Sequence, residues 1–228
     1  MQLRVLEELE GAERYNRWLA ELILPYLGDD PIEAGSGRGT NASILLGLGA
    51  SRLTVSEVDP AALAELEQRF GRDPRVVVET VDLDDAPSAS HSAIVALNVL
   101  EHIEDDRRAL RNAASLVRPG GRVVVLVPAF PFAAGNFDHA LGHHRRYTKS
   151  TLRSAYEDAE LSPEMIRYVN APGLVAWFLW VRVLRAQPRE GVLLQLWDRG
   201  VIPLAQQIES RWAPPFGQSV LAVGRVKG

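Results

Sequence analysis

The sequence predicts an α/β fold with a doubly wound, mostly parallel sheet and helices on both faces. Two observations lead to this prediction. Short apolar runs recur along the chain, such as residues 93–97 and 123–127, and their continuous apolar character is typical of strands buried on both faces. Segments of helical periodicity separate these runs, and strands that alternate with helices of this length form parallel sheets.

The predicted elements follow one another in a regular order. Apolar residues at helical spacing before residue 30 predict one or two amphipathic helices. Strands are predicted at seven places: residues 31–32, 53–55, 76–78, 93–97, 123–127, 165–169 and 219–226. Helices are predicted at residues 41–48, 60–70, 105–117 and 148–156, with Asp59 and Thr148 as N-caps. A further helical segment is inserted before the last strand.

Composition and charge narrow the class of protein. A net charge of -4 argues against broad electrostatic binding to nucleic acid. The absence of cysteine excludes disulfides, thiolate nucleophiles and zinc sites with cysteine ligands. The acidic, amphipathic start is unlike a signal peptide, and no uncharged apolar run reaches the roughly 20 residues that span a bilayer. We therefore expect a globular cytoplasmic protein with no nucleic-acid partner.

A glycine-rich loop follows the first predicted strand. Residues 33–39 read Glu-Ala-Gly-Ser-Gly-Arg-Gly and lead directly into a helical pattern. Glycine adopts positive φ and lets a ligand approach the backbone closely, while the following helix end favours an anionic group. Thr40 stands where a dinucleotide fingerprint would need its third glycine, which disfavours a nicotinamide-dependent dehydrogenase.

Three polar side chains follow successive predicted strands. Glu57 ends the second strand, Asp82 follows the third and Asn98 follows the fourth. Each of them alone is explained as well by a helix cap or a solvated turn. Ligands in such sheets bind beyond the carboxyl ends of the strands, so together with the glycine loop these residues indicate one site. Glu57 can accept hydrogen bonds from ribose hydroxyls, and Asp82 can accept one from an adenine amine.

These motifs resemble those of the class I S-adenosylmethionine-dependent methyltransferases. Residues 33–39 resemble the first motif of that family, Glu57 its acidic residue after strand two, and residues 81–83 its adenine-side motif. Residues 98–103 and 117–122 resemble the segments after strand four and before strand five. The resemblance covers roughly residues 13–170 and the last strand. It departs at Ser92, where an aspartate usually opens strand four, and at Pro31, which shortens strand one.

The resemblance implies a Rossmann-like fold with S-adenosylmethionine as the cofactor. Glycine-loop amides would hold its methionine end, Glu57 its ribose, and Glu33 would help to bind the methionyl amine. Val58 and Leu83 would sandwich the adenine, with ordinary core packing as the alternative. The implied cofactor-binding residues are Glu33, Gly35, Ser36, Gly37, Gly39, Glu57, Val58, Asp82, Leu83 and Asn98. Because the sulfonium is already a good methyl donor, the protein mainly has to align the acceptor and exclude water.

The loop after strand five carries three of the five histidines in the chain: His139, His143 and His144. Histidine titrates near neutrality and could remove an acceptor proton. His143 is the leading candidate base and His139 the second, with Glu101 or Asp138 as the carboxylate that orients the ring. We expect no metal ion, because no clear carboxylate-rich ligand spacing accompanies the three histidines.

The same loop ends in a Gly-His-His-Arg-Arg-Tyr segment. It resembles a segment of a bacterial subgroup of the family that is linked to lipid, glycan or secondary metabolism. Arg146 and Tyr147 are candidate acceptor-binding residues. The alternative is that Arg145, Arg146 and Tyr147 only anchor the loop through ion pairs and helix-end contacts.

The segment 173–184 is apolar on nearly every side and is interrupted by Arg182. It is too short to cross a bilayer and predicts a buried helix. Three interpretations stay open. The segment is a packed helix or dimer contact, an apolar wall of the acceptor site that includes Trp177, or a shallow membrane contact.

The predicted organisation is one domain in four parts. Residues 1–30 form N-terminal helices, residues 31–170 the cofactor-binding core, residues 171–217 a helical insertion and candidate acceptor lid, and residues 218–228 the final strand. The predicted function is in-line methyl transfer from S-adenosylmethionine to an oxygen or nitrogen atom of a partly apolar small molecule or lipid-like acceptor, by a monomer or homodimer. The alternative is a non-catalytic scaffold or regulatory subunit that binds a partner through the apolar insertion.

Overall fold

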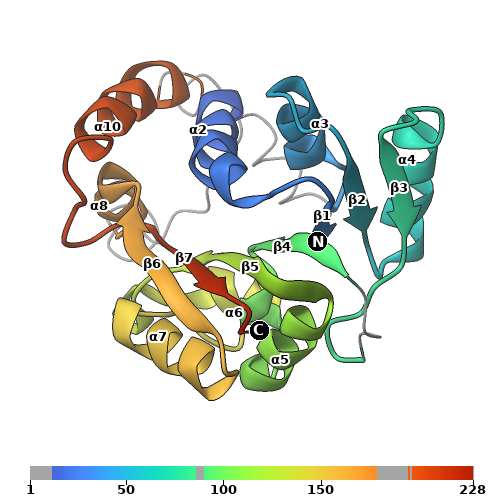
Figure 1. The fold of residues 1–228 in the computed structure, drawn as a ribbon. Helices are drawn as coiled ribbons and strands as arrows, with labels where there is room; N and C mark the ends of the chain where they lie inside the picture. The colour runs from blue at the N-terminus through green and yellow to red at the C-terminus, as the bar shows by residue number, and fades with distance from the viewer. Residues whose placement is uncertain (1–11, 86–89, 179–194, 196, 228) are drawn as a thin grey trace.

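The computed structural model describes residues 12–85, 90–178, 195 and 197–227 (Figure 1). Within these residues, one seven-stranded sheet lies between two layers of helices. The helical pattern expected in residues 1–11 lies outside the described residues, as does the part of segment 173–184 that follows residue 178.

The sheet has the predicted, mostly parallel arrangement. Its strands are β1 (Pro31–Ala34), β2 (Leu53–Ser56), β3 (Val76–Glu79), β4 (His91–Leu97), β5 (Val117–Pro128), β6 (Ser162–Val169) and β7 (Ser219–Arg225), in the order β3-β2-β1-β4-β5-β7-β6. The strands from β3 to β5 are parallel, and β7 runs antiparallel to β5 and β6. The chain order reverses between β1 and β4, and such a switch point opens a crevice beyond the carboxyl ends of the strands.

Helices cover both faces of the sheet (Figure 1). One layer contains α2 (Glu13–Ile23), α3 (Thr40–Gly47), α4 (Pro60–Phe70) and α10 (Ile202–Glu209); the other contains α5 (Asp106–Ser115) and α7 (Lys149–Asp158). The loop after β5 contains η3 (Pro131–Ala133) and α6 (Asn136–Leu141), and η2 (Leu100–His102) follows β4. The insertion between β6 and β7 includes α8 (Ala171–Trp177) and the π-helical turn η5 (Trp197–Val201).

Local sequence explains where several helices begin. The Asp59 carboxylate accepts hydrogen bonds from the amides of Ala61 and Ala62, and Pro60 occupies the first turn of α4. The Thr148 hydroxyl accepts a hydrogen bond from the amide of Thr151 at the start of α7. Both predicted N-caps are therefore confirmed. Such caps satisfy amides that have no partner inside the helix.

Strand β5 starts earlier than predicted. Residues 117–122, expected as the turn before strand five, belong to the strand itself. His91 pairs with Val117 and Ala93 pairs with Arg122, so the register shifts between these two pairs. The intervening residues, including Gly120 with φ 80°, form an irregularity inside the strand. The prediction of a turn outside the sheet was wrong because pairing resumes on both sides of this excursion.

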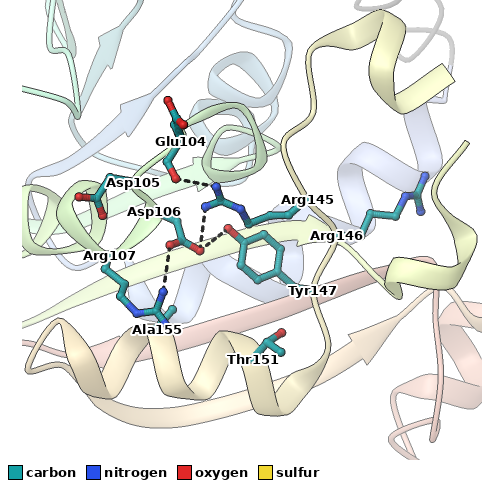
Figure 2. A pocket seen from close by; sticks show the side chains of 9 residues that line it. All are labelled: Glu104, Asp105, Asp106, Arg107, Arg145, Arg146, Tyr147, Thr151 and Ala155. Carbon is teal, nitrogen blue, oxygen red and sulfur yellow. Dashed lines mark hydrogen bonds and ion pairs between the residues drawn. The ribbon is translucent and has the colours of Figure 1, made fainter. Parts of the chain in front are cut away.

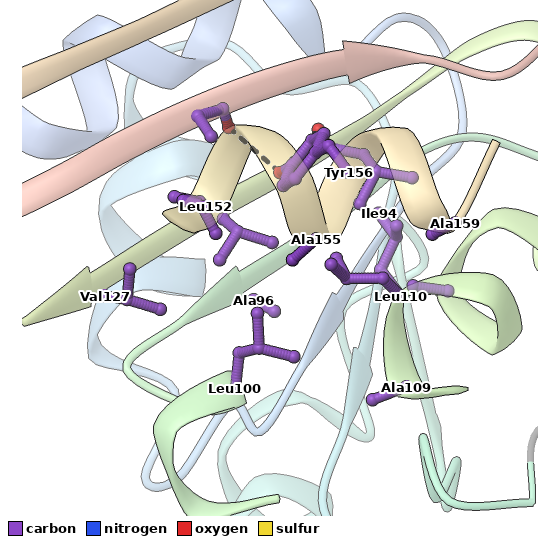
Figure 3. Close-up of a cluster of buried hydrophobic side chains, with 14 of the residues drawn as sticks. Ile94, Ala96, Leu100, Ala109, Leu110, Val127, Leu152, Ala155, Tyr156 and Ala159 are labelled. Atoms are coloured by element: carbon purple, nitrogen blue, oxygen red, sulfur yellow. Dashed lines mark hydrogen bonds between the residues drawn. The ribbon is translucent and has the colours of Figure 1, made fainter. Parts of the chain in front are cut away.

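The core on the α5 and α7 side is formed by apolar side chains of both helices and of the central strands (Figure 3). Leu152 and Tyr156 of α7 are fully buried there, with Ile94 from β4 beneath them. The Tyr156 hydroxyl donates to the carbonyls of Val123 and Ala222, at 3.3 and 3.4 Å. Its one polar group is therefore satisfied inside the core, as burial requires.

Two carboxylates fasten the insertion to the rest of the fold. Asp198 of η5 accepts hydrogen bonds from the amides of Arg14 and Tyr15 in the first turn of α2, both at 3.0 Å. Glu209 of α10 accepts from the amides of Asn170 and Ala171 at the start of α8, at 3.1 and 2.9 Å. Each carboxylate thus caps a helix that is distant in sequence, where negative charge is favoured.

The described part of segment 173–184 is not buried on all sides. Leu174 is buried, whereas 51% of Val175 and 38% of Phe178 are exposed. The prediction of a fully buried helix is wrong for this part, because α8 packs through one face only. Among the residues that the structure describes, we find no helix with the length and apolar character that crossing a bilayer requires.

Candidate cofactor and acceptor site

The carboxyl ends of three strands are aligned at one edge of the sheet. Ala34 of β1 lies opposite Ser56 of β2 on one side and Ala96 of β4 on the other. The next residues along each strand therefore emerge together, and they include the glycine loop and Glu57. The polar residues that the sequence placed at strand ends thus share the sheet edge at the switch point.

The glycine loop has the backbone that its sequence predicts. Gly35, Gly37 and Gly39 have φ values of 66°, 53° and 78°, a region that other residues rarely adopt. A Cβ on Gly35 would come within 2.6 Å of Val99, and one on Gly39 within 2.3 Å of Phe70. Packing between the loop and α4 therefore requires glycine at position 39, whether or not a ligand binds there.

Glu57 holds the glycine loop from the neighbouring strand. Its Oε2 accepts a hydrogen bond from the Gly37 amide at 2.8 Å, and its Oε1 accepts one from the Val58 amide at 2.8 Å. These two bonds fix the direction of the carboxylate at the sheet edge. Oε1 also accepts a longer bond from the Asp59 amide at 3.3 Å, so the second lone pair of Oε2 is the one that can accept a hydrogen bond from a diol.

Ser36 is tied into the backbone of the same region. Its amide donates to the Ser56 carbonyl at 2.9 Å, and its hydroxyl donates to the Glu33 carbonyl at 3.0 Å. The hydroxyl also accepts from the Ser56 amide at 3.2 Å. These contacts lock the loop onto β1 and β2.

Glu33 is a buried carboxylic acid beneath the glycine loop. Only 1% of the residue is exposed, and its Oε2 has no hydrogen-bond partner among the described residues. Burial raises its pKa to about 8, although the Ser36 hydroxyl opposes this rise. A buried polar atom without a partner is costly, so this oxygen marks a place where a ligand or water can bind.

The residues predicted on the adenine side have different surroundings. Leu83 is 5% exposed and belongs to the α5-side core, as the core-packing alternative expected. Val58 is 56% exposed, which excludes core packing for this side chain. Asp82 is exposed and accepts a hydrogen bond from the Asp84 amide at 2.9 Å. Asn98 is exposed after β4 with φ 55°.

A buried ion pair organises the loop after β5. Arg146 binds Asp138 through two hydrogen bonds, Nε to Oδ1 at 2.6 Å and Nη2 to Oδ2 at 3.2 Å, and both side chains are 4% exposed. Asp138 also accepts from the Gly135 amide at 2.9 Å. Nδ1 of His143 lies 3.1 Å from Oδ1 of Asp138. The sequence suggested Asp138 as a partner of this histidine, and the contact is present.

Burial disfavours ionisation of Asp138, but the hydrogen bonds from His143 and Arg146 and the Arg146 charge outweigh it. Together they lower the pKa of Asp138 to about 2. The carboxylate is therefore ionised at neutral pH and acts only as an acceptor. It follows that Nδ1 of a neutral His143 carries the proton, which leaves the lone pair on Nε2.

Glu101, His102 and His143 meet beside this ion pair. Each offers a ligand atom, and the three atoms lie within 4.8 Å of one another. Burial, and then the charges of His143 and His144, lower the pKa of His102 to about 4. His139 is exposed and lies outside this group. His102 was not singled out from the sequence, although it directly follows Glu101.

The side chains of Arg145 and Tyr147 both contact Asp106 at the start of α5 (Figure 2). The Tyr147 hydroxyl donates to Asp106 at 2.8 Å, and Arg145 forms an ion pair with the same carboxylate at 3.1 Å. Together with Glu104 and Thr151, Arg145 and Tyr147 line a pocket of about 380 Å³. Arg146 also lines this pocket, but its side chain points away from the other side chains drawn in Figure 2. These contacts favour the alternative in which the three residues anchor the loop.

Three aromatic side chains, Phe132, Trp177 and Phe178, form a surface beside the same loop, here called the aromatic wall. Trp177 Nε1 donates to the Ala133 carbonyl at 3.2 Å, and the Arg146 guanidinium carbon lies 4.9 Å from the centre of a Trp177 ring. The rings of Phe132 and Phe178 lie 6.3 Å apart, and Phe132 is 59% exposed. An apolar acceptor could pack against this wall.

Stability of the ligand-free protein should fall as pH rises from about 5 to about 8. Burial raises the pKa of both Glu33 and Glu101 to about 8. The folded state therefore binds these protons more tightly than the unfolded chain does. Their stabilising effect is complete below the unfolded pKa and is lost as pH rises through the folded pKa. Glu33→Gln should flatten the profile of unfolding free energy in urea, whereas the exposed Glu65→Gln should not; identical profiles would contradict the assignment.

The sequence matches known methyltransferases over part of its length. Residues 32–123 match a family profile described as a methyltransferase domain. A probable S-adenosylmethionine-dependent methyltransferase of Mycobacterium tuberculosis is 33% identical over 101 residues, which cover 43% of this chain and 35% of that protein. A ubiquinone biosynthesis O-methyltransferase of Methylocella silvestris is 30% identical over 132 residues, covering 54% of this chain and 50% of that protein. The chain spans about a third to a half of the length of these relatives.

Solved structures match nearly the whole chain. A chain of the complex between the Haloferax volcanii Trm112 methyltransferase activator and a putative methyltransferase has a TM-score of 0.66 at 15% identity, covering 96% of this chain and 93% of that chain. A geranyl diphosphate methyltransferase solved with S-adenosylmethionine has a TM-score of 0.63 at 17% identity, covering 92% and 85%. Identities this low establish the fold alone. The sequence match, the order of the motifs and this fold together support a class I S-adenosylmethionine-dependent methyltransferase.

Proposed function

We propose that this protein transfers a methyl group from S-adenosylmethionine to an oxygen or nitrogen atom of a partly apolar small molecule or lipid-like acceptor. One observation carries the proposal: the hydrogen bond that joins the Glu57 carboxylate to the Gly37 amide at the switch point of the sheet. This bond holds a carboxylate, which could accept from a ribose diol, directly against a loop whose backbone a ligand can approach.

The residues at this edge fit the cofactor. Glu57 would hold the ribose hydroxyls, and exposed Val58 would pack against the adenine. The unpartnered Oε2 of Glu33 would join, directly or through water, the network around the methionyl amine. When bound, the cofactor supplies an electrophilic methyl group on a sulfonium. The protein then has to align the acceptor and keep water away.

We propose that His143 takes a proton from the acceptor. Asp138 fixes its Nδ1–H, so that Nε2 is free to act as a base. Arg146 acts through Asp138 and is a positioning residue, as is Tyr147 through Asp106. The aromatic wall would hold the apolar part of the acceptor. We propose that the protein is a bacterial cytoplasmic enzyme of secondary metabolism.

Glu57→Ala should weaken binding of S-adenosylhomocysteine by about 10- to 100-fold, because each hydrogen bond to a charged acceptor contributes about 1.5–3 kcal/mol. Glu57→Gln keeps one carbonyl acceptor and should have an intermediate affinity. Calorimetric titration measures both. Glu157→Ala, an exposed glutamate on α7 and away from the glycine loop, is the matched control and should bind like the wild type.

Nicotinamide adenine dinucleotide serves as the competing ligand in the same titrations. We expect it to bind weakly and to give no thermal stabilisation. Tighter binding of the dinucleotide, or unchanged affinity in Glu57→Ala, would overturn the proposed cofactor site. Mass spectrometry of candidate acceptors for the gain of one methyl group would then identify the acceptor class.

A scaffold role remains the second candidate, because exposed apolar side chains gather in the insertion. Leu204, Ile208 and Trp212 are 57%, 50% and 61% exposed on α10 and just after it. Such a surface suits a protein partner. The two functions differ in one result: a scaffold would bind S-adenosylhomocysteine and a partner but would methylate no acceptor.

A further inference from the structure

We propose that Glu101, His102 and His143 bind a divalent transition-metal ion of the zinc, iron or manganese type. The sequence alone predicts no metal site, because no carboxylate-rich ligand spacing accompanies the histidines of the loop after β5. In the folded protein, His143 of that loop lies close to Glu101 and His102. These two residues belong to η2, the short helix that follows β4. The three candidate ligand atoms lie within 4.8 Å of one another.

Glu101 is the strongest sign of a missing partner. The residue is 0% exposed, and among the described residues neither of its carboxylate oxygens has a hydrogen-bond partner in another residue. A buried carboxyl group without a partner is unfavourable unless a charge or a ligand compensates it. Because one of its oxygens is a member of the three-atom cluster, an ion bound there would supply the missing partner.

The surroundings of the two histidines already orient their rings. Asp138 accepts the Nδ1–H of His143, and metal-binding histidines commonly donate their second nitrogen to a carboxylate in this way. Arg146 in turn holds Asp138 through two hydrogen bonds. His102 is hydrogen-bonded to the backbone of Gly142 and Leu141. The His102 and His143 rings lie 4.7 Å apart at 86°.

The spacing is compatible with an ion after small side-chain movements. Ligand atoms of a tetrahedral site with Zn–N distances of about 2.1 Å lie about 3.4 Å apart. The observed upper limit of 4.8 Å therefore requires a contraction on the order of 1 Å. Two imidazoles with one carboxylate favour transition metals over magnesium, which prefers oxygen ligands.

Three protein ligands leave at least one coordination position for a ligand from outside. This step rests on the proposed function: that position would hold an oxygen of the acceptor and favour its ionised form. Nε2 of His143 would then bind the ion, so the ion and not a free imidazole would promote ionisation of the acceptor. His143 is thus the base in a mechanism without a metal ion and a ligand in a mechanism with one.

The test uses the full chain, stripped with a chelator and titrated with Co²⁺ while its visible absorption is recorded. Wild type should bind Co²⁺ with a spectrum of nitrogen and oxygen ligands, and Zn²⁺ should displace it. Glu101→Gln and His143→Asn should each lose this binding. Asp138→Asn should weaken Co²⁺ binding by roughly 10- to 100-fold, which is typical when a residue that orients a metal ligand is replaced. His139→Ala, an exposed histidine of the same loop, is the matched control and should bind normally.

Thermal unfolding followed by circular dichroism establishes that each variant is folded. If the variant at buried Glu101 does not fold, the His143→Asn variant alone tests the metal site. Absent binding, or equal binding in His143→Asn and His139→Ala, would overturn the metal site. Methyl transfer that survives chelation would overturn the role of the ion, yet leave the proposed function intact. Loss of cofactor binding in the Glu57 titrations affects the proposed function alone, so the two failures are distinguishable.

Discussion

Asp138→Ala should destabilise the protein by about 3–5 kcal/mol, the typical cost of removing one partner from a buried ion pair. Arg146 would keep the Ala129 carbonyl and the Trp177 ring but would lose its counter-charge in a place that is 4% exposed. His143 and the Gly135 amide would lose an acceptor as well. Urea unfolding, followed by circular dichroism in the presence of a chelator, gives the free energy without a contribution from a bound ion.

The matched control is the exposed pair of Arg107 and Asp158, which are 2.6 Å apart. Asp158→Ala should cost less than about 1 kcal/mol, because water screens the charges of exposed pairs. Adding Arg146→Met to Asp138→Ala should restore part of the stability, since it removes the uncompensated buried charge. Equal losses in Asp138→Ala and Asp158→Ala would show that the buried pair does not organise the loop.

Gly35→Ala should reduce affinity for S-adenosylhomocysteine by about 10- to 100-fold, because displacement of the loop removes hydrogen bonds to the charged groups of the ligand, which contribute about 1.5–3 kcal/mol each. The backbone at Gly35 has φ 66°, and the new Cβ would come within 2.6 Å of Val99. To relieve this contact the loop must move, and Gly37 would then leave its position against Glu57.

Gly49→Ala separates backbone strain from displacement of the loop. Gly49 has φ 105° just beyond α3, and a Cβ there would meet nothing within 4 Å. Both variants should lose about 1–2 kcal/mol of stability from the positive φ. Only Gly35→Ala should lose ligand affinity in calorimetry. Normal binding by a folded Gly35→Ala variant would reduce the glycine loop to a structural turn.

Much of the fold could be predicted because its signals are local. Strands such as β4 are continuous apolar runs, and the cap at Asp59 lies next to the helix that it starts. The extent of β5 could not be predicted, since its first residues join the sheet by pairing with His91, which is distant in sequence. The same is true of Asp198 and Glu209, which cap helices far from them in the chain.

The candidate site divides in the same way. Glu57 and the glycine loop are recognisable because the order of strands places their motifs at one sheet edge. The partner of each loop residue is a matter of side-chain direction, which spacing does not specify: Arg146 turns to Asp138 while its neighbour Tyr147 turns to Asp106. Ser92, the departure from the family pattern, has a local role: its hydroxyl accepts from the Asp30 amide at 2.8 Å.

The carboxylate of Asp198 joins α2 and η5 into a single cooperative unit. The amides of Arg14 and Tyr15 are protected from solvent only while η5 is in place, and Gln206 adds a second link to Glu21 of α2. Detachment of η5 from α2 should therefore expose these two amides to hydrogen exchange. An acceptor whose binding stabilises this contact would slow their exchange, so deuterium uptake at the start of α2 can report on acceptor binding.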